Sequence, residues 1–247
     1  LTDVAGLYRD WPDTASLVAK LREHQVAEAW AGSYEALLHK DITSVNARLA
    51  EECARHPGWL VPIGALNPKL PGWEEDLRRI AEVHHMPGLR LHPNYHGYSL
   101  DDPVFERVLR LARERELLVQ IAVILEEERT IHPLVNVPAT QLAPLSAVLA
   151  KVPGVRLQLL NAFRTLRGLT ALSLASLGVS FEIAMLEGVN GVATLLETLP
   201  GDRLCFGSHA PFFYFESAKL KLRESILSEA QLAAVSRDNA ARLIARR

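Results

Sequence analysis

Three histidines follow short apolar runs in this sequence, at places where a buried strand is expected to end. His92 and His96 lie in RLHPNYH after the run Gly88–Leu91, and His209 follows LCFGS. Because imidazole titrates near neutral pH, a histidine at a strand end can act as a general acid or base. Taken singly, each could equally be a hydrogen-bonded side chain that closes a strand. Polar neighbours on other strands favour a functional site.

Further polar residues stand at the ends of neighbouring apolar runs. Arg90 has the planar donor geometry to hold a carboxylate or to stabilise developing negative charge. Glu182, or Glu187 after it, could orient His209. We therefore predict His209, Glu182 and Arg90 as catalytic residues. The residues predicted to hydrogen-bond a small polar substrate are His92, Asn94, His96, Gln120, Asn161, Arg164 and His132.

These residues can meet only if the fold gathers its strand ends in one place. Short apolar runs alternate with longer amphipathic segments, which indicates parallel strands joined by right-handed crossovers. Near-continuous apolar strands indicate a sheet that is covered on both faces. In a closed barrel of such units the site lies at the carboxyl ends of the strands. The expected strands are residues 3–4, 27–32, 60–66, 88–91, 117–124, 155–160, 179–184 and 204–206.

The covering helices are expected where apolar residues recur three and four positions apart. Segment 216–247 is helical in pattern throughout, with a capping box that begins at Ser228. A barrel of this kind typically has about 250 residues. We predict one domain, residues 1–247, with an α/β fold: a single (β/α)8 TIM-like barrel with extra C-terminal helices. The other expected helices are 14–24, 42–55, 73–84, 103–114, 142–151 and 190–198.

The composition favours a globular protein with a small-molecule substrate. Hydrophobic residues make up 49% of the chain, the net charge is −2, and no Lys/Arg run is present. We therefore expect neither nucleic acid nor a membrane as a partner. Cys53 and Cys205 fit no metal-binding spacing and are expected to be buried thiols in a reducing cytoplasm. The aromatic run 212–215 is expected to pack against the terminal helices and to support a homo-oligomer contact.

Several segments resemble the amidohydrolase superfamily, in the branch that includes decarboxylases and dicarboxylate lactonases. GLRLHP followed by DDP resembles the fourth-strand segment of that branch, and DRLCFGSHAPF resembles its last-strand motif. RDNAARLIARR resembles its closing helix, and TDVAGLY stands where its first strand would lie. The resemblance implies a barrel fold, with hydrolysis or decarboxylation of small acids, lactones and amides as the reaction class.

The metal ligands that the resemblance implies are absent from the matching positions. They would be two histidines on the first strand, a histidine after each of the fifth and sixth strands, and an aspartate after the last. A catalytic divalent cation needs about three protein ligands of the imidazole, carboxylate or thiolate type. We therefore predict no metal and no other cofactor. The residues that match these positions are Ala5, Leu7, Gln120 or a near neighbour of it, Asn161 and His209.

Three interpretations of the site remain open. The first is an amidohydrolase-related enzyme without the usual metal, which acts on a small polar or carboxylate-bearing substrate at the barrel rim. The second is a catalytically inactive barrel that is retained for small-acid binding or assembly. The third is a relocated divalent metal such as zinc, although the proline and glycine near the first two histidines argue against a helix that would align them. Its ligands would be His92, His96, Glu182 and His209.

Overall fold

All strand pairs in the computed structural model, which describes residues 13–126 and 137–244, are parallel. β1 (Ala29–Ala31) pairs with β2 (Leu60–Pro62). Only Ile63 separates β2 from β3, and its N–H donates to the Ala31 carbonyl at 2.8 Å, so β2 and β3 continue as one strand beside β1. The larger sheet runs in sequence order through β3 (Gly64–Ala65), β4 (Gly88–Leu91), β5 (Leu118–Ala122), β6 (Arg156–Leu160), β7 (Ser180–Glu182) and β8 (Leu204–Cys205).

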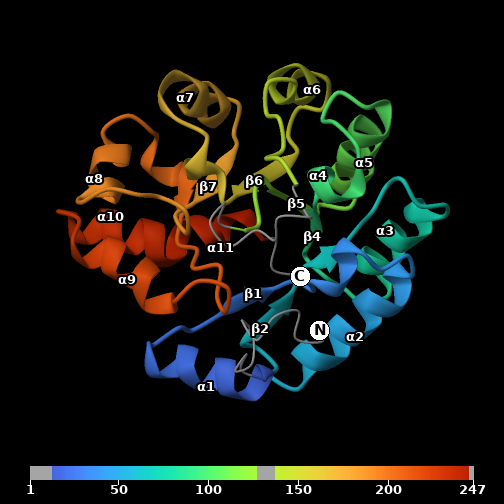
Figure 1. Cartoon of the computed structure of the whole chain (residues 1–247), viewed down its shortest axis with the longest axis horizontal. Helices are drawn as coiled ribbons and strands as arrows, with labels where there is room; N and C mark the ends of the chain where they lie inside the picture. The colour runs from blue at the N-terminus through green and yellow to red at the C-terminus, as the bar shows by residue number, and fades with distance from the viewer. Residues whose placement is uncertain (1–12, 127–136, 245–247) are drawn as a thin grey trace.

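Figure 1 shows the helices as an outer ring around the strands, with α9 and α10 completing the ring between α8 and α1. This arrangement is the predicted (β/α) barrel with extra C-terminal helices. The ring helices are α1 (Thr14–Glu23), α2 (Ile42–Ala54), α3 (Trp73–Glu82), α5 (Pro103–Glu114), α6 (Leu145–Lys151), α7 (Gly168–Ser176) and α8 (Gly191–Leu196). The remaining helices are the short α4 (Pro93–His96), then α9 (Phe215–Arg223), α10 (Glu229–Ala233) and α11 (Asn239–Leu243).

Residues alternate along each strand between the helices and the barrel interior. Leu89 and Val119 belong to the large core cluster that includes Phe105 of α5, so they face the helices. In contrast, Trp30 of β1 packs with Cys205 of β8 in a cluster around Leu118. These residues come from strands at opposite ends of the sheet order, and they can meet only inside the barrel. The barrel therefore has its own interior layer of side chains.

The expected strands between residues 27 and 206 are confirmed, and the expected strand at 3–4 lies outside the described residues. The periodicity did not single out α7, because its sequence GLTALSLAS is apolar on almost every side. Leu169 in that helix is 84% exposed. The prediction of continuous helix after residue 216 is wrong, because α9 ends at Arg223 and a π-helical turn, Ala234–Asp238, separates α10 from α11.

The thiols of Cys53 and Cys205 are unpaired and buried, as predicted. Among the described residues, no helix has both the length and the apolar character that a membrane span requires.

Asn46 fastens α2 to β3 through two hydrogen bonds to one residue. Its Oδ1 accepts from the Ala65 N–H at 2.8 Å, and its Nδ2 donates to the Ala65 carbonyl at 2.9 Å. The Asn46 side chain is buried, with 2% of the residue exposed. Both backbone groups of Ala65 therefore depend on this amide.

Asn46→Ala is expected to lower the free energy of unfolding by roughly 2–4 kcal/mol, because two buried backbone groups lose their partners. Denaturant unfolding followed by circular dichroism measures the change. Glu51→Ala on the exposed side of the same helix is the matched control and should change stability by less than about 0.5 kcal/mol. Equal losses in the two variants would show that the amide does not fasten α2.

Candidate active site

A row of polar side chains crosses the barrel interior on three neighbouring strands. Arg90 of β4 is in register with Gln120 of β5, which is in register with Gln158 of β6. The Nε of Arg90 donates to Oε1 of Gln120 at 2.9 Å, and Nε2 of Gln120 donates to Oε1 of Gln158 at 2.8 Å. Both glutamines are 2% exposed. This chain of hydrogen bonds fixes the direction of the Arg90 guanidinium.

The Arg90 guanidinium also lies close to the end of β1. A Cβ built on Gly32 would come within 2.6 Å of Nη1, so a side chain at this position would displace the guanidinium. Burial lowers the pKa of Arg90, whereas the nearby Tyr34 and Glu182 raise it. Among the described residues, no carboxylate forms an ion pair with Arg90. Arginine stays protonated in proteins, so the barrel holds a partly buried positive charge that Glu182 stabilises from a distance but that no described carboxylate contacts directly.

His209 follows β8 and adopts a left-handed backbone conformation with φ of 53°. Its Nε2 lies 2.8 Å from the Leu125 carbonyl and 3.2 Å from the Tyr34 hydroxyl. A carbonyl can only accept, so Nε2 carries the proton and Nδ1 keeps the lone pair. Burial lowers the pKa of His209 to about 4. The imidazole is therefore neutral at pH 7, so it can donate a proton only after it has first accepted one.

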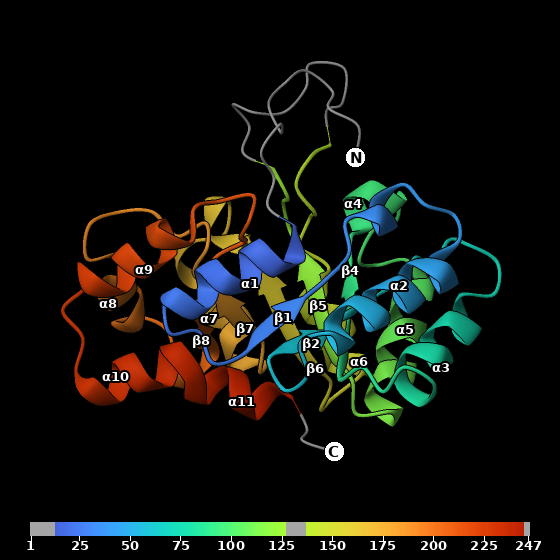
Figure 2. The same ribbon diagram turned by 90° about the horizontal axis from the view of Figure 1, so that it is seen from below.

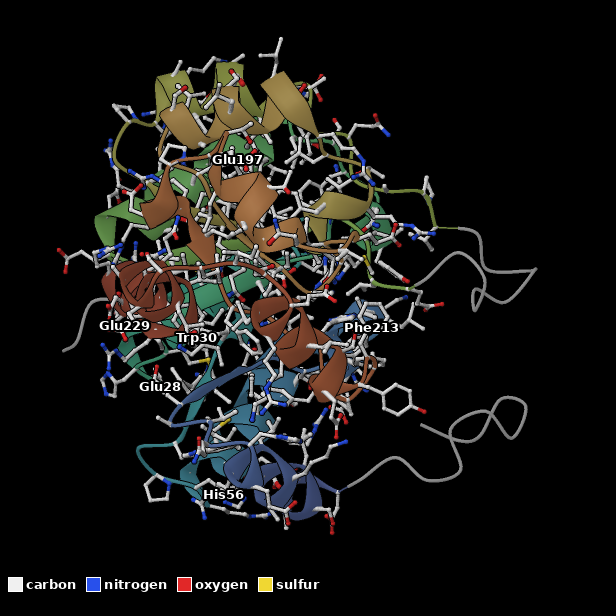
Figure 3. The ribbon with its side chains drawn as sticks, turned by 90° about the vertical axis from the view of Figure 1, so that its left-hand side faces the viewer. Glu28, Trp30, His56, Glu197, Phe213 and Glu229 are labelled. Atoms are coloured by element: carbon white, nitrogen blue, oxygen red, sulfur yellow. The ribbon has the colours of Figure 1, made fainter. Side chains whose placement is uncertain are left out.

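The aromatic run after β8 packs around this histidine. Phe212 is stacked on His209 with ring centroids 5.3 Å apart, and Phe213 meets it edge-on at 5.1 Å. The ring of Tyr34 also packs against that of Phe212, with ring centroids 3.9 Å apart. Figure 3 shows Phe213 on the side of the molecule opposite Trp30 and Glu229. Phe215, the first residue of α9, packs with Val18 and Leu21 of α1 and with Trp59, so its contacts are not the predicted ones with the C-terminal helices.

Glu182 binds backbone groups at the ends of the strands. Its Oε2 accepts from the Ala184 N–H at 2.6 Å, and its Oε1 accepts from the Asn161 N–H. Gly207 lies so close that a Cβ there would come within 2.1 Å of Oε2. Burial raises the pKa of Glu182, and the two N–H donors oppose that rise. The predicted pairing of Glu182 or Glu187 with His209 is wrong, because the Leu125 carbonyl and the Tyr34 hydroxyl orient the imidazole instead.

The residues that the sequence analysis missed are Lys221 and Tyr34. Lys221 reaches from α9 to the end of β7, where its Nζ donates to the carbonyls of Ile183, at 3.2 Å, and Ala184. Burial lowers the pKa of Lys221. The sequence contains no sign of this role, because a lysine in the amphipathic stretch KLKL is typical of the exposed face of a helix. Tyr34 lies two residues beyond the expected strand 27–32, and a search of the two residues that follow each strand would have found it.

His92 and His96 lie at the two ends of the one-turn helix α4. The Nε2 of His96 donates to the Ala36 carbonyl at 3.0 Å, and the two imidazoles meet edge-on with centroids 5.9 Å apart. The Nδ1 atoms of both rings are buried without a partner among the described residues. The expectation of no helix here is wrong, because Pro93 is at the first helical position and Gly97, with φ of 68°, ends the turn. Both residues are favoured at those positions.

The other predicted binding residues mainly hold loops in place. The Nδ2 of Asn94 donates to the Pro138 carbonyl at 3.0 Å, and the Nδ2 of Asn161 donates to the Ile124 carbonyl at 2.9 Å. Arg164 forms an ion pair with Glu187 at 2.5 Å. That glutamate is 60% exposed, which places the pair at the surface. His132 lies outside the described residues. A substrate contact of these residues stays a prediction.

The family profile described as Amidohydrolase matches residues 12–246, so the chain belongs to the amidohydrolase family. No curated protein matches the sequence. The 5-carboxyvanillate decarboxylase of Novosphingobium aromaticivorans superposes with a TM-score of 0.75 at 15% identity, over 96% of this chain and 85% of that one. The enzyme of the same name from Sphingomonas paucimobilis gives 0.74 at 16%, over 94% and 83%. A dihydroxybenzoic acid decarboxylase from Polaromonas sp. gives 0.70 at 14%, over 94% and 86%. At these identities the likeness establishes the barrel fold.

The prediction of a protein without a cofactor is contradicted by these structural neighbours. The Novosphingobium and Polaromonas structures are described with bound manganese. In this chain, the described residues do not form a matching donor set. They contain no group of three His, Cys, Asp or Glu side chains that could hold a metal ion, and a zinc site at the four residues suggested by the sequence is not formed. The amide of Gln120 is engaged by Arg90, and the hydrogen-bonding nitrogen of His209 faces the Leu125 carbonyl.

Stability should fall between pH 7 and pH 5.5, because burial lowers the pKa of His92, His96 and His209. The unfolded chain takes up protons below about pH 6.5 that the folded imidazoles do not. Each such histidine contributes a slope of up to about 1.4 kcal/mol per pH unit. The raised pKa of Glu182 acts in the opposite direction, but one carboxyl offsets only one of the three imidazoles.

Denaturant unfolding at the two pH values measures this slope. His92→Gln should flatten it, whereas His39→Gln at an exposed position should leave it unchanged. Equal stability at pH 7 and pH 5.5 in the unsubstituted protein would contradict the assignment of neutral, buried imidazoles.

Proposed function

We propose that this chain is an enzyme that binds a small aromatic carboxylic acid at the carboxyl ends of its strands and removes carbon dioxide from it. The observation that carries the proposal is the Arg90 charge, with which no described carboxylate forms an ion pair. A bound anion would supply the missing counter-charge and two further hydrogen-bond acceptors for the guanidinium. The likeness in fold to decarboxylases of carboxylated aromatics supports this class of reaction.

An aromatic substrate is favoured by the rings beside the charge. Tyr34 raises the pKa of Arg90, and Arg90 lowers the pKa of His209, so both rings lie near the guanidinium. Both rings also contact Phe212. Flat rings pack well against a planar substrate, and such pairs contribute about 0.5–1.5 kcal/mol beyond the burial of area. An apolar wall next to a fixed cation therefore favours a planar acid over a flexible one.

The group that Arg90 holds should not be the carboxylate that leaves. Decarboxylation breaks a carbon–carbon bond, moves the electron pair onto the ring carbon and releases carbon dioxide. A guanidinium bound to the leaving carboxylate would stabilise the ground state more than the transition state and would slow the reaction. The proposed substrate therefore carries a second acidic group, and Arg90 binds that group.

His209 is proposed to move the proton. Its Nδ1 carries the lone pair, so the neutral imidazole can take a proton from a ring hydroxyl of the substrate. The pKa of about 4 makes the resulting imidazolium a strong acid. It can therefore return the proton to the ring carbon when carbon dioxide leaves, which restores the neutral imidazole. The Leu125 carbonyl and the Tyr34 hydroxyl hold the ring in the orientation that this exchange needs.

Small-acid binding without turnover is the second candidate. It is favoured by the donor chemistry of the described residues, which do not form the kind of metal cluster that the decarboxylases of this fold suggest. In both candidates Arg90 binds the acid. In the second candidate no carbon dioxide is released.

Arg90→Gln is expected to weaken binding of a hydroxybenzoic acid with two carboxylates by roughly 100-fold, because the variant loses a desolvated charge–charge contact. Titration calorimetry measures binding, and carbon dioxide release, with and without added manganese, measures turnover. The mono-amide of the same acid should bind the variant and the original protein equally weakly. Arg110→Gln, in an exposed ion pair on α5, is the control, and circular dichroism checks that each variant folds.

Equal affinity of Arg90→Gln and the original protein for the acid would remove Arg90 from the site. Tight binding without carbon dioxide release under either metal condition would replace the enzyme proposal with the second candidate.

A further inference from the structure

The hydrogen-bonded row across β4, β5 and β6 has a fixed direction. Nε of Arg90 can only donate, so Gln120 faces it with its amide oxygen and turns its NH2 group toward Gln158. Figure 2 shows these three strands side by side, with α4 at their carboxyl ends and α11 at the opposite end. Both glutamines are buried, so water does not compete for their amides. Both polar atoms of the Gln120 side chain are therefore engaged by the protein.

Cys205 ends this row on β8 and makes it adaptable. The side chain of Gln158 forms a hydrogen bond with the Cys205 thiol, whose pKa burial raises to about 12. A thiol that keeps its proton can accept a hydrogen bond or donate one. If a carboxylate replaced the amide of Gln120, Gln158 could turn over, donate to that carboxylate and accept from the thiol. Such a replacement leaves every side chain of the row with a partner.

The row also gives Arg90 an uncharged partner. Gln120 occupies one of the five N–H donors of the guanidinium, and the other four belong to Nη1 and Nη2. The two oxygens of a carboxylate can bind together at the edge between the Nη atoms. Glu182 acts on Arg90 from a distance and raises its pKa less than Tyr34 does. A carboxylate at position 120, in contrast, would form an ion pair with Nε and cancel the charge that attracts an anion.

We propose that Gln120 makes the barrel mouth select an acid over the uncharged analogue of that acid. Its amide oxygen orients the guanidinium as a carboxylate would, but it leaves the positive charge for the ligand. Gln120 is a positioning residue that acts through Arg90 and does not itself contact the substrate. This inference rests on the proposed function, because it concerns the second acidic group that Arg90 is proposed to bind.

Gln120→Glu tests the inference, since it keeps the hydrogen-bond acceptor and adds one negative charge. Titration calorimetry compares a hydroxybenzoic acid that carries two carboxylates with its mono-amide. The original protein should bind the acid roughly 100-fold more tightly than the mono-amide. Gln120→Glu should bind the acid at least about 10-fold more weakly than the original protein does, with less than about a 3-fold change for the mono-amide.

Two control variants separate the added charge from other disturbances. Gln158→Met breaks the row at its second hydrogen bond without adding charge, so it should weaken acid binding only a few-fold and keep the preference for the acid. Gln25→Glu adds the same charge at an exposed position before β1, at the other end of the barrel, and should bind both ligands as the original protein does. Circular dichroism checks the fold. If Gln120→Glu does not fold, Gln158→Glu places the charge one strand further from Arg90 and should reduce the preference at least about 3-fold.

Loss of the preference in the Glu variant, but not in Gln158→Met or Gln25→Glu, is the result that we expect. An unchanged preference in the Glu variant, or an equal loss in Gln158→Met, would overturn the role of Gln120 and leave Arg90 as the acid-binding residue. An original protein that binds the acid and the mono-amide alike would overturn the proposed function, and this inference with it.

Discussion

A positive charge held inside a barrel, without an ion-pair partner among the described residues, is the constraint on which the proposed chemistry depends. The guanidinium of Arg90 is aligned by Gln120 and given room by the absence of a side chain at Gly32. Desolvating a charge is costly unless another group compensates for it. We propose that such a charge at a strand end binds an anion, and that the aromatic rings around His209 favour a planar one.

The parallel strands explain how this arrangement arises from residues that are far apart in the sequence. In-register residues of adjacent strands share a face, so Arg90, Gln120 and Gln158 form one row although about 30 to 40 positions separate neighbours. The residues between them, such as Leu89 and Val119, face the helices and build the core. Successive residues of a strand thus point alternately to the apolar core under the helices, which stabilises the barrel, and to its polar interior. Glu182 then ties the ends of β6 and β7 together from within.

Periodicity predicted the strands well because each is a short apolar run bounded by polar residues. It failed at α7, whose leucines lie on several sides, and at α4, where Pro93 and Gly97 bound a single helical turn. The search for polar residues at the ends of the predicted strands found Arg90 and His209. It could not find the partners of His209, because Leu125 and Tyr34 lie 84 and 175 positions away, and the Leu125 partner is a backbone carbonyl that residue type does not reveal. We expected no metal because the residues at the positions that match the family's metal ligands are of other types. The structural neighbours with bound manganese contradict that expectation.

A crystal structure of the protein with a di-acidic benzoate would test the role of the Arg90 charge most directly. Our account predicts one carboxylate of the ligand within about 3 Å of the Arg90 Nη atoms, with the aromatic ring against Phe212 and His209. An acid bound elsewhere, with Arg90 ion-paired to a carboxylate of the protein itself, would contradict it.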